Sequence, residues 1–217
     1  MTTILIADDH DLVRTSISRM LTDVYGYEVV GEACSGEEAV KNARSMQPDI
    51  VLMDVKMPGY GGIEATRKIL QSCENTRIIA LTGVVEDLFA KQLMNAGASG
   101  YVTKGAGFEE IVTAIKSVQR GERYMSRAIA QKIALANFSG AADHESPFDK
   151  LSDRELQTTI MISRGERVQD IAETLSVSPK TVNSYRYRIF EKLGINTDVE
   201  LALLAVKHNL LDGEPSD

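Results

Sequence analysis

The sequence predicts an α/β unit built on a doubly wound parallel sheet, followed by a smaller all-α unit. The first observation is an alternation of short apolar runs with helical patterns over residues 2–120. The second is that, from about residue 123 onward, only helical periodicity remains. Five strand–helix repeats within roughly 120 residues are typical of a parallel sheet, and right-handed crossovers then place helices on both of its faces.

The expected strands of the first unit are short apolar runs, each followed by a helical pattern. The strands are Ile4–Ala7, Tyr27–Cys34, Ile50–Met53, Ile78–Leu81 and Ser99–Val102. The helices, recognised by apolar residues at helical spacing, are Arg14–Leu21, Glu37–Arg44, Ile63–Leu70, Leu88–Ala96 and Glu109–Val118.

A connecting segment separates the two units. Ser126–Asn137 is predicted to form one amphipathic helix, whereas Ser139–Pro147 has no periodicity and is rich in small and polar residues, as linkers are. We therefore expect a first domain over residues 1–122, a linker helix with a flexible linker over 123–148, and a second domain over 149–211.

The second unit contains four short helical patterns without strand signals. They are Asp153–Ile162, Val168–Leu175, Pro179–Leu193 and Asp198–Asn209. Ser152 with Glu155 three residues later has the pattern of a capping box, in which each residue hydrogen-bonds the backbone of the other. Ser178 precedes Pro179 at a first helical position, where the missing N–H of proline costs nothing.

Composition and charge restrict the class of protein. The chain has 217 residues, a hydrophobic content of 43% and a net charge of −7. No apolar run approaches 18 residues and no basic-then-apolar N-terminus is present, so we expect no membrane span and no signal peptide. Cys34 and Cys73 have no metal or redox spacing and are expected to be buried, reduced thiols, which favours a cytosolic location.

The acidity is not evenly distributed along the chain. Residues 1–148 contain 15 Lys and Arg against 19 Asp and Glu, whereas residues 149–211 contain nine of each. Within the second unit, segment 178–193 has four bases and one acid. The net acidity of the whole chain therefore does not exclude nucleic-acid binding by the second unit.

Polar side chains follow the strands of the first unit where each strand ends. Asp8 and Asp9 follow the first strand, Asp54 the third, Thr82 the fourth and Lys104 the fifth. The carboxyl ends of parallel strands meet at one edge of a sheet, so these side chains are expected to converge. Clustered carboxylates repel one another and suit Mg²⁺, and a carboxylate can act as the nucleophile that forms an aspartyl phosphate.

This pattern resembles the receiver domain of bacterial two-component response regulators, which has a flavodoxin-like (βα)5 fold. The residues that carry the resemblance are Asp8, Asp9, Asp54, Thr82, Tyr101 and Lys104. It implies that Asp54 takes a phosphoryl group from a histidine of a sensor kinase. It also implies Mg²⁺ binding by Asp8, Asp9, Asp54 and the backbone carbonyl of Lys56, with Thr82 and Tyr101 as switch residues that reorient on phosphorylation.

The second unit contains the pattern of a helix-turn-helix. Segment 169–178 is a predicted helix with a tight turn, and Pro179 begins the next helix. The apolar residues expected between the two helices are Ile171, Ala172, Leu175, Val177, Val182 and Ile189. Lys and Arg side chains on the second helix can neutralise DNA phosphates, while Asn and Ser side chains can contact the edges of nucleobases in the major groove.

This half resembles the four-helix DNA-binding domain of the LuxR/FixJ/NarL class. The residues that carry the resemblance are Leu151–Glu155, Ile171–Ala172, Lys180–Val182 and Lys192–Gly194. It implies binding of double-stranded DNA by the helix Pro179–Leu193. The positions implied to face bases are Asn183, Ser184 and Tyr187. Those implied to face phosphates are Lys180, Thr181 and Arg188.

The resemblance can be narrowed to the GacA/UvrY/VarA group. Segments 8–14, 52–59 and 181–188 carry this closer similarity. It implies a hybrid sensor kinase of the BarA/GacS type as partner. It also implies activation of small regulatory RNAs that titrate a translational repressor of the CsrA/RsmA type.

We expect a phosphorylation-gated transcription factor that is a homodimer when active. The helix Asp198–Asn209 is the expected interface, with Leu201, Leu204 and Ala205 on one face. His10, His144 and His208 show no metal spacing and are expected on the surface or at helix caps.

Two alternatives remain for the function. A phosphohydrolase of the haloacid-dehalogenase type also forms an aspartyl phosphate, but it needs a second Asp two residues after the nucleophile, where Lys56 stands here. A ligand-gated LuxR-type regulator is the other alternative, and it would not need the acidic set with Lys104.

Overall fold

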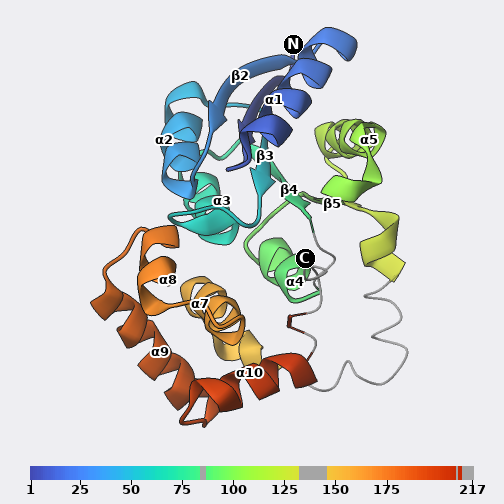
Figure 1. The fold of residues 1–217 in the computed structure, drawn as a ribbon. Coiled ribbons are helices and arrows are strands. Elements are labelled where there is room, and N and C mark those ends of the chain that lie inside the picture. Colours follow the sequence, from blue (N-terminus) through green and yellow to red (C-terminus); the bar gives the residue numbers. More distant parts are fainter. Residues whose placement is uncertain (84–86, 132–145, 209, 212–217) are drawn as a thin grey trace. The chain divides into compact units, whose positions relative to one another are not determined.

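The structure is a computed structural model that describes residues 1–83, 87–131, 146–208 and 210–211. The chain divides into two units, Met1–Ala134 and Leu135–Asp217, and Figure 1 shows the sheet-containing and the helical part. No helix within these described ranges combines the length and the apolar character needed to cross a membrane.

The first unit is built on a six-stranded parallel sheet with the order β2-β1-β3-β4-β5-β6. Its strands are β1 Thr3–Ala7, β2 Glu28–Ala33, β3 Ile50–Asp54, β4 Arg77–Thr82, β5 Gly100–Thr103 and β6 Tyr124–Met125. The five predicted strands are confirmed. The short β6 was not predicted, because two residues are too few to show a strand period, and it pairs with Gly100 and Tyr101 at the edge of the sheet.

Helices follow the strands as the sequence predicts. They are α1 Asp11–Arg19, α2 Gly36–Met46, α3 Gly61–Ser72, α4 Asp87–Asn95 and α5 Phe108–Gln119. A π-helical turn, η1 Met20–Val24, continues α1, and a 3₁₀ turn, η2 Lys104–Ala106, connects β5 to α5. The helix predicted for Ser126–Asn137 is helical from residue 127 to 131. Residues 132–137 of this prediction and residues 139–145 of the predicted linker lie outside the described residues.

Apolar side chains leave the central strands on alternate faces and form two cores. Ile4 and Ile6 belong to a cluster with residues of α1 and α5. Leu5 and Ala7 belong to a second cluster with residues of α2 and α3, which also contains the buried Cys73. The expectation of two buried thiols is wrong for Cys34, which is exposed. Figure 1 shows these helix pairs on opposite sides of the sheet. Because both faces of the central strands β1, β3 and β4 are buried, these strands hold charged side chains only at their ends.

The second unit is helical. Its elements are η4 Pro147–Lys150, α7 Asp153–Ser163, α8 Val168–Thr174, α9 Pro179–Leu193 and α10 Asp198–Lys207. The predicted capping box is present, since Ser152 and Glu155 each accept from the other's backbone N–H. The Ser178 hydroxyl oxygen accepts from the backbone N–H of Thr181 at the start of α9, which confirms the second predicted cap.

Phe148 is fully buried in this unit, although the sequence analysis places it in the linker. Its ring meets that of His208 edge-on, with 5.9 Å between the ring centroids. Within the described residues, the helical packing of the second unit thus includes η4, whose first two residues precede the start expected for this domain.

Candidate functional site

Three carboxylates converge at the carboxyl edge of the sheet. β1 and β3 pair in parallel with Ala7 opposite Met53, so Asp8 and Asp54, the next residues of each chain segment, are neighbours. Both are buried. Asp9 follows Asp8, and one ligand atom from each of Asp8, Asp9, His10 and Asp54 lies within 4.8 Å of the others. The convergence that the sequence predicts for the three acids is present.

Lys104 brings a positive charge to two of these acids. It begins the turn after β5, and its Nζ lies 2.6 Å from Asp8 Oδ2 and 2.9 Å from Asp54 Oδ2. Its side chain is only 19% exposed, so water screens the two pairs weakly. The cluster thus contains three carboxyl groups and one ammonium, which contacts two of them, so negative charge is in excess when the acids are ionised.

The surroundings of Asp54 act against its ionised form. Burial raises the pKa of Asp54 to about 6, and the neighbouring Asp8 carboxylate acts in the same direction, whereas Lys104 lowers it. Burial of Lys104 opposes its own charge, but the carboxylates of Asp54 and Asp8 outweigh this and raise the pKa of the ammonium. A further cation would relieve the remaining repulsion.

The donor set suits a hard divalent cation. Carboxylate oxygens are the ligands that Mg²⁺ prefers, and Mg²⁺ is usually held by one or two of them with water and phosphate. Asp9 reaches partly into solvent, with 33% of its side chain exposed, which leaves access for water. Beside this group, the backbone N–H of Lys56 donates to Asp54 Oδ1 at 3.3 Å.

His10 lies closer to the acids than the sequence analysis expected. Its Nδ1 is 2.9 Å from Asp9 Oδ1 and 3.4 Å from Asp8 Oδ1, and it occupies the N-cap position of α1 without a side-chain capping bond. The ring is on the surface as expected, with 67% of the side chain exposed. Its position directly after the acid pair is the signal that could have indicated this contact.

The other two residues predicted for this site lie on β4 and β5. Thr82 ends β4, the strand that pairs with β3, and its side chain is buried. Tyr101 lies on β5 between Ala80 of β4 and Met125 of the edge strand β6, and it is completely buried. Thr82 therefore stands at the same edge as Asp54, while Tyr101 lies one strand further along.

Gly62 allows α3 to start directly against the Asp54 backbone. A Cβ at this position would lie 2.2 Å from the carbonyl oxygen of Asp54 and 2.8 Å from the Cα of Val55. The N–H of Gly62 also donates to the Val55 carbonyl at 3.1 Å. Because no side chain can occupy this space, glycine is needed to hold the loop after β3 in its position.

In the second unit, α8 and α9 form the predicted helix-turn-helix. Their small core buries Ile171, Ala172, Leu175, Val182 and Ile189, and Val177 is half-buried. The N–H of Val177 donates to the Ala172 carbonyl at 2.9 Å and closes the turn between the helices. This core anchors one face of α9, while Lys180, Ser184, Tyr187 and Arg188 of the same helix are exposed.

Two of the four bases on α9 are already paired within the unit. Arg186 makes a two-pronged contact with Asp198 at the start of α10, with distances of 2.7 and 2.6 Å. Lys192 Nζ lies 2.6 Å from the buried carboxylate of Glu155. Lys180 and Arg188 are exposed. The charge that α9 can offer to a polyanion is therefore smaller than the sequence count indicates.

The residues predicted to face bases differ in their surroundings. Tyr187 is 73% exposed, Asn183 is half-buried, and Ser184 is exposed with its hydroxyl donating to the Lys180 carbonyl at 3.0 Å. Thr181, predicted to face phosphate, shares its hydroxyl with that of Ser178 at 2.9 Å in the helix cap. Ser184 is thus placed to accept a hydrogen bond rather than to donate one.

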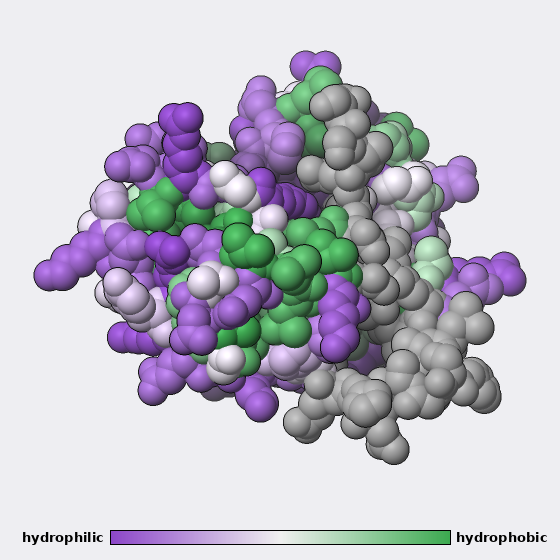
Figure 2. Space-filling view, turned by 60° about the horizontal axis from the view of Figure 1, so that its bottom comes forward, coloured by the Kyte–Doolittle hydropathy of each residue, from purple (hydrophilic) through white to green (hydrophobic). Residues whose placement is uncertain are grey.

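Of the three interface residues expected on α10, Leu201 and Ala205 are wrong because they are buried within the unit. Leu201 and Ala205 are completely buried in the core of the second unit, and Leu204 is half-buried, so this face packs inward. The apolar residues that α10 exposes are Val199, Leu203 and Val206, which are four and three residues apart on the opposite face. Figure 2 brings forward the side that carries α10 in Figure 1, and apolar side chains reach the surface there.

The comparisons with known proteins agree with this architecture. Residues 4–116 match the family model for the response regulator receiver domain, and residues 149–205 match that for bacterial regulatory proteins of the luxR family. The chain is 57% identical over 212 residues to the response regulator GacA of Pseudomonas aeruginosa, covering 98% of this chain and 99% of the relative. It is 51% identical over 214 residues to UvrY of Escherichia coli, covering 99% and 98%.

Solved structures show the same folds. A LuxR-family response regulator from Aurantimonas sp. superposes with a TM-score of 0.61 at 44% identity, over 64% of this chain and 99% of that one. RcsB of Salmonella typhimurium superposes with a TM-score of 0.69 at 22% identity, over 95% and 98%, a likeness of fold alone.

Proposed function

The chain belongs to the two-component response regulators that join a receiver domain to a LuxR-type regulatory domain, and on this premise we propose that Asp54 is the phosphoryl acceptor. The observation that carries the proposal is the placement of Asp54, buried at the end of a central strand with the Lys104 ammonium at 2.9 Å. Of the clustered acids, Asp54 alone is the last residue of a strand with sheet neighbours on both sides.

The chemistry follows from this placement. A carboxylate oxygen of Asp54 attacks the phosphorus of a phosphohistidine on the sensor kinase. The O–P bond forms as the P–N bond breaks, and the electron pair leaves with the imidazole nitrogen. Lys104 neutralises charge on the phosphoryl oxygens, and the Thr82 hydroxyl donates a hydrogen bond to one of them.

Asp8, Asp9, Asp54 and the backbone carbonyl of Lys56 are the proposed ligands of Mg²⁺. When bound, the ion supplies positive charge that offsets both the carboxylates and the incoming phosphoryl group. The excess of negative charge around Lys104 supports this assignment. Thr82 and Tyr101 are the proposed switch residues.

This chain acts as a phosphoacceptor and transcription factor rather than as an enzyme with its own substrate. A hydrolase of the haloacid-dehalogenase type would need a carboxylic acid two residues beyond the nucleophile. Lys56 stands there, and its backbone N–H donates to Asp54. The proposed location is the cytoplasm, where the proposed sensor kinase, of the BarA/GacS type by resemblance, transfers its phosphoryl group.

We assign double-stranded DNA to α9. Lys180, Thr181 and Arg188 are the proposed phosphate contacts, and Asn183, Ser184 and Tyr187 are the proposed base contacts. The exposure of Lys180, Arg188 and Tyr187 supports the assignment. Genes for small regulatory RNAs are the targets implied by the resemblance to the GacA/UvrY group.

The active form is proposed to be a homodimer. One helix covers little of the major groove, whereas two half-sites double the contact surface. The exposed apolar residues of α10, Val199, Leu203 and Val206, form a stripe that a second copy of this chain would cover. This replaces the buried residues that the sequence analysis assigned to the interface.

Labelling by radioactive acetyl phosphate with Mg²⁺ tests the phosphoryl acceptor. Asp54→Asn should abolish the label, because the amide is not a nucleophile for this transfer. Asp23→Asn, which removes an exposed carboxylate from η1, is the matched control and should label normally. A label that survives Asp54→Asn would refute the assignment, and full labelling in EDTA would refute the requirement for Mg²⁺.

A further inference from the structure

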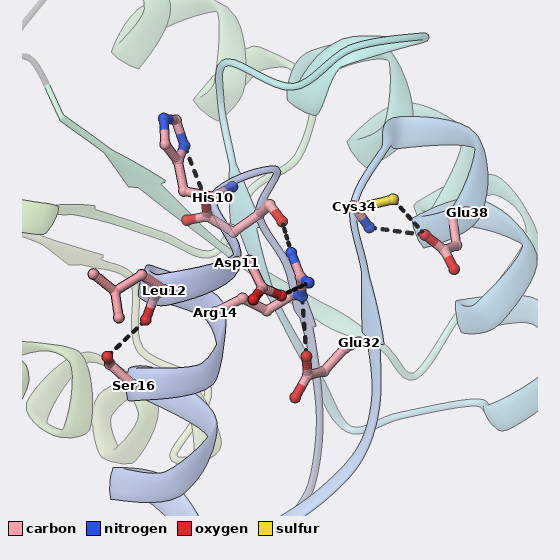
Figure 3. A network of polar contacts seen from close by, with 9 residues as sticks. His10, Asp11, Leu12, Arg14, Ser16, Glu32, Cys34 and Glu38 are labelled. Atoms are coloured by element: carbon pink, nitrogen blue, oxygen red, sulfur yellow. Dashed lines mark hydrogen bonds and ion pairs between the residues drawn. The ribbon is translucent and has the colours of Figure 1, made fainter.

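Arg14 of α1 connects three segments around the acid cluster. Its Nη1 donates to the backbone carbonyl of Asp8 at 2.8 Å, its Nε donates to Glu32 Oε2 of β2 at 3.0 Å, and its Nη2 donates to Asp11 Oδ1. Figure 3 shows the guanidinium between Asp11 and Glu32. The side chain is only 14% exposed, so the fork is held in place on several sides.

The contact with Asp8 is to the backbone, and this gives it a particular consequence. The N–H of Asp8 donates to the Ala33 carbonyl of β2 at 3.0 Å, and the pairing of β1 with β3 ends one residue earlier, at Ala7. The Asp8 carbonyl therefore lies beyond the hydrogen-bonded pairing of β1 with β3. It accepts a hydrogen bond from the Arg14 guanidinium instead. With both polar groups of Asp8 held, the peptide plane between Asp8 and Asp9 has a fixed orientation.

That peptide plane sets the direction of Asp9. The Asp9 side chain is one-third exposed, and the side chain it meets is the more exposed ring of His10. An exposed ring immobilises a carboxylate only weakly, so the position of Asp9 depends mainly on its backbone. The Arg14 contact therefore reaches Asp9 through the Asp8 carbonyl.

We propose that Arg14 is a positioning residue that orients the Asp8–Asp9 pair for a divalent cation. The inference rests on the Mg²⁺ site of the proposed function and adds a residue outside its ligand set. Arg14 does not touch the cation or the phosphoryl group. It acts through the backbone, and its rigid fork makes three contacts in different directions that a lysine cannot reproduce together.

Electrostatics alone predicts the opposite effect, which makes the inference testable. Arg14 is a positive charge near the proposed cation site, and Asp11 and Glu32 offset it. Replacing Arg14 by a neutral residue leaves these two carboxylates without their partner and makes the region more negative. A purely Coulombic account therefore predicts tighter Mg²⁺ binding, whereas loss of positioning predicts weaker binding.

Isothermal titration of the full chain with Mg²⁺ alone distinguishes the two accounts. Arg14→Gln should raise the Kd for Mg²⁺ about tenfold, the scale seen when a group that orients metal ligands is removed. Arg14→Lys keeps the charge and should raise the Kd severalfold. Arg19→Gln, which removes an exposed arginine from the same helix, is the matched control and should leave the Kd unchanged.

An unchanged or lower Kd in Arg14→Gln overturns the inference, and if that variant does not fold, an unchanged Kd in Arg14→Lys does so. The Mg²⁺ dependence of acetyl phosphate labelling provides a second readout. The half-saturating Mg²⁺ concentration should rise in Arg14→Gln, while labelling at saturating Mg²⁺ returns to that of the unaltered chain. Equal half-saturation in the two proteins also overturns the inference.

The outcomes separate this inference from the proposed function. If the unaltered chain binds no Mg²⁺, the metal site fails and the inference fails with it. If the unaltered chain binds Mg²⁺ and is labelled on Asp54, but Arg14→Gln behaves identically, only the positioning role is lost.

Discussion

The two units of this chain hold their functional charges in opposite ways. In the receiver, carboxylates are buried at strand ends, with one ammonium within 3 Å of two of them. On α9, the bases lie at the surface, and two of the four are bound to acids of the same unit. The fold itself therefore assembles the acid cluster. The few charges that α9 presents form a binding site only when α9 lies against DNA.

This difference has an energetic reason. Buried charges are costly, so the sheet must position each one against a partner, and the resulting geometry is fixed before any ligand arrives. Exposed charges cost little, so nothing in the fold requires them to converge. Loss of a partner of a buried charge should therefore lower folding stability, whereas loss of an exposed charge on α9 should weaken DNA binding.

The largest effect is expected from Lys104→Met. This substitution leaves the buried Asp8 and Asp54 carboxylates without their counter-charge, and breaking such a pair costs about 3–5 kcal/mol. Hydrogen exchange of the β3 and β4 amides in EDTA should show a lower free energy of opening, and Mg²⁺ should restore part of it. Lys41→Met, on the exposed side of α2, should have little effect. Equal exchange in both variants would mean that the ammonium is not needed for the stability of the cluster.

The two faces of α10 should respond differently to truncation. Leu201→Ala removes a fully buried side chain and should destabilise the second unit by about 2–5 kcal/mol. Leu203→Ala removes an exposed side chain and should leave the unfolding free energy within about 0.5 kcal/mol, while weakening self-association. Urea unfolding by circular dichroism and sedimentation equilibrium measure the two effects. Normal self-association of folded Leu203→Ala would exclude this face as the interface.

The contacts that α9 makes with DNA base edges and with DNA phosphates should be separable by mutation. Asn183→Ala should cost about 1–3 kcal/mol on the specific site and little on random DNA. Arg188→Ala should weaken binding to all sequences and lower the slope of affinity against salt concentration by about one. Fluorescence anisotropy with specific and random duplexes over a range of salt concentrations measures both. Parallel losses on the two duplexes for both variants would contradict the assigned roles.

The smallest effect is a dependence of the second unit's stability on pH. Burial of Glu155 acts to raise its pKa, but Lys192 and the Ser152 backbone N–H outweigh this and lower the pKa overall. A lowered pKa adds stability that is present above the unfolded value near 4.3 and is lost as pH falls through the folded value.

Glu155→Gln should therefore cost about 1–2 kcal/mol at neutral pH and flatten the acid limb of stability against pH. Glu173→Gln, which alters an exposed acid on α8, is the control and should keep the acid limb. Thermal unfolding between about pH 3 and pH 7, a range that includes the pKa of glutamate in the unfolded chain, provides the measurement. An acid limb that persists in Glu155→Gln would assign it to another group.

Polar residues at the carboxyl ends of parallel strands meet at one edge of the sheet, and this explains how much of the receiver could be predicted from its sequence. Each of Asp8, Asp54 and Thr82 follows or ends an apolar run, and the parallel sheet then brings them to one edge. The contact of Arg14 with the Asp8 carbonyl could not be predicted in this way. It depends on a backbone group and on the side-chain path from α1, neither of which leaves a periodic signal.

The helical unit shows the limit of the same reasoning. Apolar residues at helical spacing predicted α10 correctly, but this helix carries apolar residues on two faces. Leu201 with Ala205 and Leu203 with Val206 have equally good spacing, so only packing against α7 decides which pair is buried. The pairing of Arg186 with Asp198 likewise depends on the approach of two helices, and a count of charges cannot reveal it.

We propose that phosphorylation of Asp54 in the acid cluster controls both dimerisation and DNA binding by the second unit. Sedimentation equilibrium and DNA titration of the same sample, with Mg²⁺ and with or without acetyl phosphate, test it most directly. The dimer fraction and the DNA affinity should rise together in the unaltered chain, and neither should rise in Asp54→Asn. A chain that binds DNA as a monomer with equal affinity in both states would contradict the account.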